Sequence, residues 1–93
     1  MPSTAHALIG SVLAGAQETA TTALVSPTIL PPGCDHLWSL VRDAWAAGRQ
    51  PTAGTLRAAA PGQASLILDC LHASVNPAEA DYLASRLLEQ HDR

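Results

Sequence analysis

The sequence predicts an all-α fold, organised as one compact domain of about six short helices. Ala and Leu supply most of its apolar mass, and both favour helices because they lose little side-chain entropy there. Aromatic residues are scarce, with two Trp, one Tyr and no Phe. Because alanine-lined helices approach one another closely, this mixture favours helix packed on helix over a sheet. A chain of 93 residues supports one such core, spanning residues 1–93.

The first helix is predicted to begin at Ser3 or Thr4, whose side chains can cap it, and Gly15 weakens its end. Residues 18–25, rich in Thr and Ala, predict a second short helix. Residues 26–33 hold three prolines and a glycine, so we expect a loop there. The first helix carries an apolar stripe at helical spacing, formed by Leu8, Ile9, Val12 and Leu13.

The clearest helix is predicted from Cys34 or Asp35 to Ala47. Gly48 follows its last apolar residue and Pro51 comes three positions later, which is the expected stop signal. The apolar face of this helix is formed by Leu37, Trp38, Val41, Ala44 and Trp45.

Thr52 is expected to cap a short helix that runs through Ala60, with Leu56 as its main apolar contact. The next segment, residues 63–73, is apolar on most sides. A helix of that kind belongs inside a fold, so we expect it to be the central and most buried helix.

The last helix has the strongest start signal in the chain. Asn76 can cap it, Pro77 suits its first position, and it is predicted to continue to about Gln90. Its buried face is expected to be Ala80, Leu83, Ala84 and Leu87.

Composition argues against an enzyme and against a nucleic-acid binder. The formal net charge is −3, and the five Arg are spread over positions 42, 49, 57, 86 and 93. Phosphate backbones are bound by clustered cations, so little direct nucleic-acid binding is expected. The chain contains no Lys, which a phosphate-binding loop requires, and no strained Gly-x-Ser-x-Gly turn. We therefore expect no catalytic residues and no cofactor.

Two Cys-x-His spacings, Cys34 to His36 and Cys70 to His72, supply four residues of the types that bind zinc. Residues two apart on a helix point about 200° apart, so each pair splays. We therefore expect no metal site, with the cysteines acting as small buried apolar residues.

Residues 34–60 also have the spacing of a helix-turn-helix. A recognition helix presents Arg, Lys, Asn or Gln to base edges, whereas this one offers Thr55 and Arg57 among alanines. A packed helical corner is the preferred interpretation, and a DNA-binding regulator is kept as an alternative.

The apolar stretch over residues 7–16 is about half the length of a membrane span and has no basic segment before it. Two cysteines make no disulfide framework. We expect a cytoplasmic protein with no membrane association.

Four segments, in order, resemble the N-terminal domain of the DnaB-family replicative DNA helicases. Residues 7–13, Ala-Leu-Ile-Gly-Ser-Val-Leu, resemble the opening helix of that domain. Residues 29–38, Ile-Leu-Pro-Pro-Gly-Cys-Asp-His-Leu-Trp, resemble its loop leading to a His and then an apolar pair. Residues 48–56 resemble the segment of that domain in which a Gly, a short polar step, a helix cap and a Thr-Leu pair follow one another. Residues 73–84 resemble the segment that leads into a helix through an Asn and a Tyr.

The chain departs from the family at several places. The Asp-Pro that follows the first helix is replaced around Ala16-Gln17-Glu18, and the Asp-type cap is Thr52. The Gly-Gly-x-x-Tyr-Leu segment is reduced to residues 61–66, Pro-Gly-Gln-Ala-Ser-Leu. The helical hairpin that pairs subunits in the family is expected beyond Arg93.

The resemblance implies a non-catalytic scaffold domain of the primosome in DNA replication. In such helicases this domain forms a collar on the hexameric ring and helps recruit primase or a loader, while a separate motor domain binds ATP and DNA. The implied partners are primase or a helicase loader, together with self-association as a weak dimer or within a hexameric ring. The alternative is a stand-alone helical adaptor, or a phage or mobile-element protein that mimics the helicase head.

Three side chains are the candidate partner interface for protein–protein interaction. Tyr82 and Leu88 lie at the margins of the last helix, and Trp45 lies on the Trp-bearing helix. For Leu37 and Trp38 on that same helix, packing in the core is the preferred role.

Overall fold

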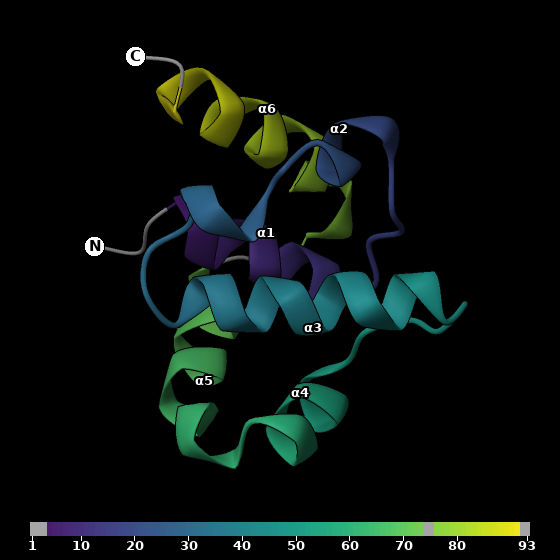
Figure 1. Cartoon of the computed structure of the whole chain (residues 1–93), viewed down its shortest axis with the longest axis vertical. Coiled ribbons are helices and arrows are strands. Elements are labelled where there is room, and N and C mark those ends of the chain that lie inside the picture. The colour runs from purple at the N-terminus through teal and green to yellow at the C-terminus, as the bar shows by residue number, and fades with distance from the viewer. Residues whose placement is uncertain (1–3, 74–75, 92–93) are drawn as a thin grey trace.

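The computed structural model describes residues 4–73 and 76–91, and this part of the chain is helical with no β-strand (Figure 1). The fold class predicted from sequence, a compact all-α domain of six helices, is confirmed. The α-helices are α1 (Thr4–Leu13), α2 (Ala20–Ala23), α3 (Cys34–Ala46), α4 (Ala53–Ala59), α5 (Ala64–Ala73) and α6 (Ala80–His91).

Three short 3-10 turns, each opened by a proline, connect some of the helices. They are η1 (Pro27–Ile29), η2 (Pro61–Gln63) and η3 (Pro77–Glu79). Proline fits the first position of a helical turn because its φ is already helical and its missing N–H has no partner there to lose. The last helix therefore starts with a 3-10 turn, and α6 itself begins only at Ala80.

The centre of the molecule is α1, which packs mainly against α5 and α6 and also contacts α3 (Figure 1). The buried Ser11 hydroxyl donates to the carbonyl of Leu8 at 2.7 Å, so its polar atom is satisfied inside the core. Small residues on this helix allow its neighbours to pack closely. The buried residues of α1 are Ala5, Leu8, Ile9, Gly10, Ser11 and Val12.

The prediction that residues 63–73 form the central, most buried helix is wrong. In α5 only Ile67 and Cys70 are buried, and Leu68 is 52% exposed. The helix carries apolar residues around most of its circumference, but only one face meets α1. Hydrophobic content predicts burial only when neighbouring elements are present to cover every face, and here one face has no cover.

The long helix α3 follows its prediction closely at both ends. It begins at Cys34 and ends at Ala46, and Gly48 adopts a left-handed φ of 74° directly after it. The N–H of Gly48 donates to the carbonyl of Trp45 at 2.9 Å, and that of Arg49 to Ala44 at 2.8 Å. These two bonds form a Schellman motif, which ends the helix at the stop that Gly48 and Pro51 predict. The face predicted to be buried is confirmed for Leu37, Trp38, Val41 and Ala44, while Trp45 is half-buried.

The capping predictions can be checked at two helices. Thr52 caps α4 through its side-chain oxygen, which accepts from the N–H of Thr55 at 3.1 Å. Asn76 accepts from the N–H of Ala78 at 3.0 Å and so opens η3. Ser3 lies outside the described residues. The predicted buried face of the last helix is confirmed, since Ala80, Leu83, Ala84 and Leu87 are all buried.

Side chains far apart in sequence join the helices to one another. The Gln50 side-chain amide donates to the carbonyls of Val12 and Ala16 at 3.1 and 3.2 Å, so the turn after α3 caps the end of α1. The Thr19 hydroxyl donates to the Asp81 carboxylate and ties the start of α2 to α6. None of the described helices combines the length and apolarity that crossing a bilayer requires.

Substitution of Gly33 by Ala is expected to lower the free energy of unfolding by about 1–3 kcal/mol. Gly33 precedes α3 with a φ of 91°, a conformation that L-residues rarely adopt. A Cβ there also comes 2.8 Å from Cδ2 of Leu66, a flexible atom that can shift, so the φ angle accounts for most of the loss. Urea unfolding followed by circular dichroism measures the change. Gly62→Ala is the matched control, because a Cβ at that position meets nothing within 4 Å, and equal stability of the two variants contradicts the prediction.

Candidate docking surfaces

An open, largely apolar groove lies between α4 and α5. One hollow of about 280 Å³ is lined on the α4 side by Ala53 and Arg57 and on the α5 side mainly by Leu68 and Leu71. A second hollow of about 410 Å³ lies next to the first, with Arg57 and Ala64 lining both. We call the combined feature the α4–α5 groove. Its full lining is Ala53, Gly54, Arg57, Ala58, Pro61, Ala64, Ser65, Ile67, Leu68 and Leu71.

The short helix α4 forms one wall of the groove, and its sequence provides an N-terminal cap and a single side chain that packs in the core. Thr52 caps it, and of its seven residues only Leu56 is buried in the core. Gly54 and Ala58 present little or no side chain toward the groove. Small side chains cannot fill the space beside α5, which leaves the groove open.

The lining of the groove is apolar apart from two side chains. Arg57 is the one charged residue among the lining residues, and Ser65 is their one hydroxyl. The lining includes no His, Cys, Asp or Glu. An apolar hollow with a single cation at its side fits a partner that offers an apolar side chain and a carboxylate.

The three residues predicted as a partner interface lie elsewhere. Tyr82 on α6 is 59% exposed, and the Arg86 guanidinium donates to its hydroxyl at 3.1 Å. Leu88 is partly buried against the core. Trp45 is also half-buried, edge-on to Trp38 with ring centroids 5.7 Å apart, and its indole N–H is buried with no hydrogen-bond partner in the described part of the chain. A docking role for these three residues stays a prediction.

The α4–α5 groove is not among the features predicted from the sequence. The signal was present, since residues 63–73 carry more apolar side chains than one buried face of a helix requires. That excess was interpreted as complete burial, whereas an open face produces the same pattern.

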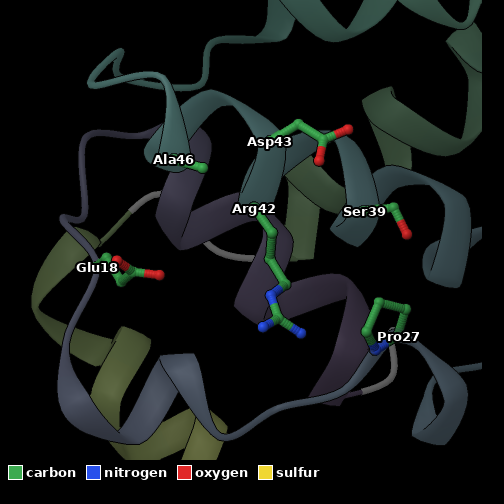
Figure 2. A pocket seen from close by; sticks show the side chains of 6 residues that line it. All are labelled: Glu18, Pro27, Ser39, Arg42, Asp43 and Ala46. Atoms are coloured by element: carbon green, nitrogen blue, oxygen red, sulfur yellow. The ribbon is translucent and has the colours of Figure 1, made fainter.

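A third hollow, of about 440 Å³, lies between α3 and the segments around α2 and η1 (Figure 2). Figure 2 shows the Arg42 side chain reaching into its centre, with Glu18 on one side and Pro27 on the other. The Arg42 guanidinium donates to the carbonyl of Val25 at 3.5 Å, the same oxygen that accepts from the Trp38 indole at 2.9 Å. One cation beside the carboxylates of Glu18 and Asp43 makes a poor anion site, so we assign Arg42 a structural role.

The two cysteines meet inside the core, although they come from distant segments. Cys34 opens α3 and Cys70 lies in α5, and both are buried free thiols. The hydrogen bond from the Cys70 thiol lowers the pKa of Cys34, against the opposing effects of burial and the Asp35 carboxylate. The same hydrogen bond and burial raise the pKa of Cys70.

The histidines of the two Cys-x-His spacings do not share this environment. His36 and His72 are exposed, as the splayed geometry of each pair predicts. Over residues 4–73 and 76–91, no group of three or more His, Cys, Asp or Glu side chains is placed to hold a metal ion.

Both thiols are expected to react with iodoacetamide on the order of 100-fold more slowly in the native protein than in denaturant, because the reagent reaches them only when the core opens. Mass spectrometry over a time course, with and without urea, counts the alkylated sites. Rapid alkylation of the native protein contradicts the burial. Metal analysis of the same preparation is the independent check. One equivalent of zinc contradicts the interpretation that both cysteines act as apolar core residues.

The helix-turn-helix spacing corresponds to α3, a turn and α4. The second helix has seven residues, and it exposes Thr55 and Arg57 as expected. The turn itself is used internally, because Gln50 caps the end of α1. One cation on a two-turn helix gives little electrostatic attraction for duplex DNA.

Comparison of the chain with protein-family models, with curated proteins and with solved structures gives no significant match.

Proposed function

We propose that this chain is a non-catalytic docking domain of the kind found at the N-terminus of replicative DNA helicases, where it recruits primase or a helicase loader and contributes to subunit assembly. The observation that carries the proposal is the ordered set of four short segments that resemble that family, spread from residue 7 to residue 84. Any ATP-dependent helicase activity belongs to a separate motor domain, and the partners are proteins.

The helix boundaries support the proposal at three of these matches. Residues 7–13 lie within α1, and the Pro-Pro-Gly loop of residues 29–38 leads into α3 at Cys34. Residues 48–56 span the stop after α3 and the cap and first turn of α4, with Thr52 in the capping role of the family's Asp. The helix boundaries at these three segments are in keeping with the proposed resemblance.

The surface also supports a docking role. Three large apolar side chains are more than half exposed among the described residues, namely Leu24 (69%), Tyr82 (59%) and Leu68 (52%). Exposed apolar area that is grouped with a groove is typical of sites that bind other proteins. The α4–α5 groove provides such a grouping around Leu68.

Isothermal titration of the purified domain with the primase and with the helicase loader encoded in the same genome tests the proposal. Saturable one-to-one binding to either protein is the expected result. Single-stranded and duplex DNA at low salt serve as comparison ligands, and only weak binding is expected because the cations are scattered.

Two outcomes contradict the proposal. The first is binding to neither protein, together with a reading frame that encodes no ATPase. The second is steeply salt-dependent binding to duplex DNA, which favours the DNA-binding regulator instead. Sedimentation of the domain alone measures the expected weak self-association.

A further inference from the structure

We infer that the α4–α5 groove is the docking site for one amphipathic helix of another protein, which places leucine-like side chains against α5 and a carboxylate against Arg57. This inference rests on the proposed docking role, but it does not depend on the resemblance to replicative helicases. It names the surface and the chemistry of the partner.

The first argument is the uncovered face of α5. Its core face, with Ile67 and Cys70, is buried, and α1 is the main helix packed against α5. A second apolar stripe, Ala64, Leu68 and Leu71, has the i, i+4, i+7 spacing of a helix–helix contact and lines the groove. Among the three large apolar residues that are more than half exposed in residues 4–73 and 76–91, Leu68 is the one that lines this groove.

The second argument is the shape of the opposite wall. Ala53, Gly54 and Ala58 of α4 project little side chain into the groove, and Pro61 also lines it. Small residues let a helix backbone approach closely, which brings helix axes to within about 8–10 Å. A helix laid in a groove through side chains one and two turns apart is a common mode of peptide recognition.

The third argument is charge. Arg57 is the one charged side chain lining both hollows, and it makes no hydrogen bond or ion pair with the described part of the chain. A carboxylate one turn from the apolar residues of the partner helix complements Arg57.

Selection of helix-patterned 16-residue peptides by phage display against the whole chain tests the inference. The probe is the most enriched peptide, synthesised with a fluorescent label, and the measurement is its Kd by anisotropy. We expect enriched peptides to carry Leu, Ile or Met at i, i+3 or i+4, and i+7, with Asp or Glu beside them.

Three variants of the protein locate the binding site. Leu68→Glu is expected to weaken binding about tenfold or more, because it places a charge in the apolar centre of the contact. Arg57→Gln is expected to weaken binding about two- to fivefold, the effect of one exposed ion pair. Leu24→Glu is the matched control, the same change at a leucine that is 69% exposed and does not line the groove, and it is expected to leave Kd unchanged. Circular dichroism confirms that each variant is folded.

A double-mutant cycle isolates the ion pair. Replacing the carboxylate of the peptide by its amide is expected to weaken binding to the wild type but to cause no further loss with Arg57→Gln. Additive losses overturn the assignment of Arg57.

The remaining outcomes overturn the inference as a whole. These are the absence of any enriched peptide, and equal binding to the wild type and Leu68→Glu. A concentration-dependent dimer that Leu68→Glu abolishes also overturns it, because the occupant is then a second copy of this chain.

The inference and the proposed function can fail separately. If the Leu68→Glu variant still binds primase or the loader, the α4–α5 groove is not the docking site, whereas the proposed function is retained. If peptides bind in the groove but neither primase nor the loader binds the domain, the groove is supported as a docking site and the helicase assignment is overturned.

Discussion

Trp38→Ala is expected to lower the free energy of unfolding by about 3–5 kcal/mol, the range observed when large buried aromatic residues are truncated. Trp38 has no exposed surface, and its indole N–H donates to the carbonyl of Val25 at 2.9 Å. It also packs edge-on against Trp45. Since domains of this size are stable by only roughly 5–14 kcal/mol, the loss removes a large part of the total. Urea unfolding followed by far-UV circular dichroism measures it.

Trp38→Phe is the matched control for this prediction. It keeps an aromatic ring in the core but removes the N–H, so the Val25 carbonyl retains only the longer contact with Arg42 at 3.5 Å. The expected loss is about 1–3 kcal/mol, a value typical of removing one buried hydrogen-bond partner together with some packing. If the alanine variant is no less stable than the phenylalanine variant, Trp38 does not occupy the core position described above.

Leu8→Ala in α1 is expected to cost about 2–5 kcal/mol, whereas Leu68→Ala in α5 is expected to cost about 0.5 kcal/mol or less. Both substitutions remove the same three carbon atoms from a helix. Leu8 is fully buried at the centre of the fold, but Leu68 is 52% exposed in the α4–α5 groove. The difference between the two values therefore measures which helix is central.

Chemical unfolding of both variants under identical conditions checks this pair. Equal losses, or a larger loss for Leu68→Ala, contradict the central position of α1 and return α5 to the place that its composition predicted. If Leu8→Ala loses much more stability than Leu68→Ala, the Leu68→Ala variant remains folded. The role of Leu68 in peptide binding can then be measured separately.

Local signals in the sequence accounted for most of the helices. Gly48 and Pro51 predicted the end of α3, and the Schellman motif at Gly48 is the structure behind that signal. Thr52 and Asn76 predicted caps that the structure contains. Such signals succeed because a cap or stop depends on hydrogen bonds between residues that are close in sequence.

The errors arose where the answer depends on distant segments. Residues 63–73 were expected at the centre, since their apolar content says nothing of how many neighbours cover the helix. The bond from Gln50 to the carbonyls at the end of α1 joins residues 34 and 38 positions apart, and no local pattern predicts it. The environment of each thiol is set by the contact between Cys34 and Cys70, and not by the histidine two residues along the chain.

By itself, the sequence determined that this chain is helical, where most of its helices begin and end, and which faces of α3 and α6 are apolar, because these properties depend on residues within one or two turns of each other. Only the tertiary structure decided that α1 is the central helix and that the second apolar stripe of α5 faces a groove. Burial is a property of the neighbours that surround a side chain, and those neighbours are set by the packing of the whole chain.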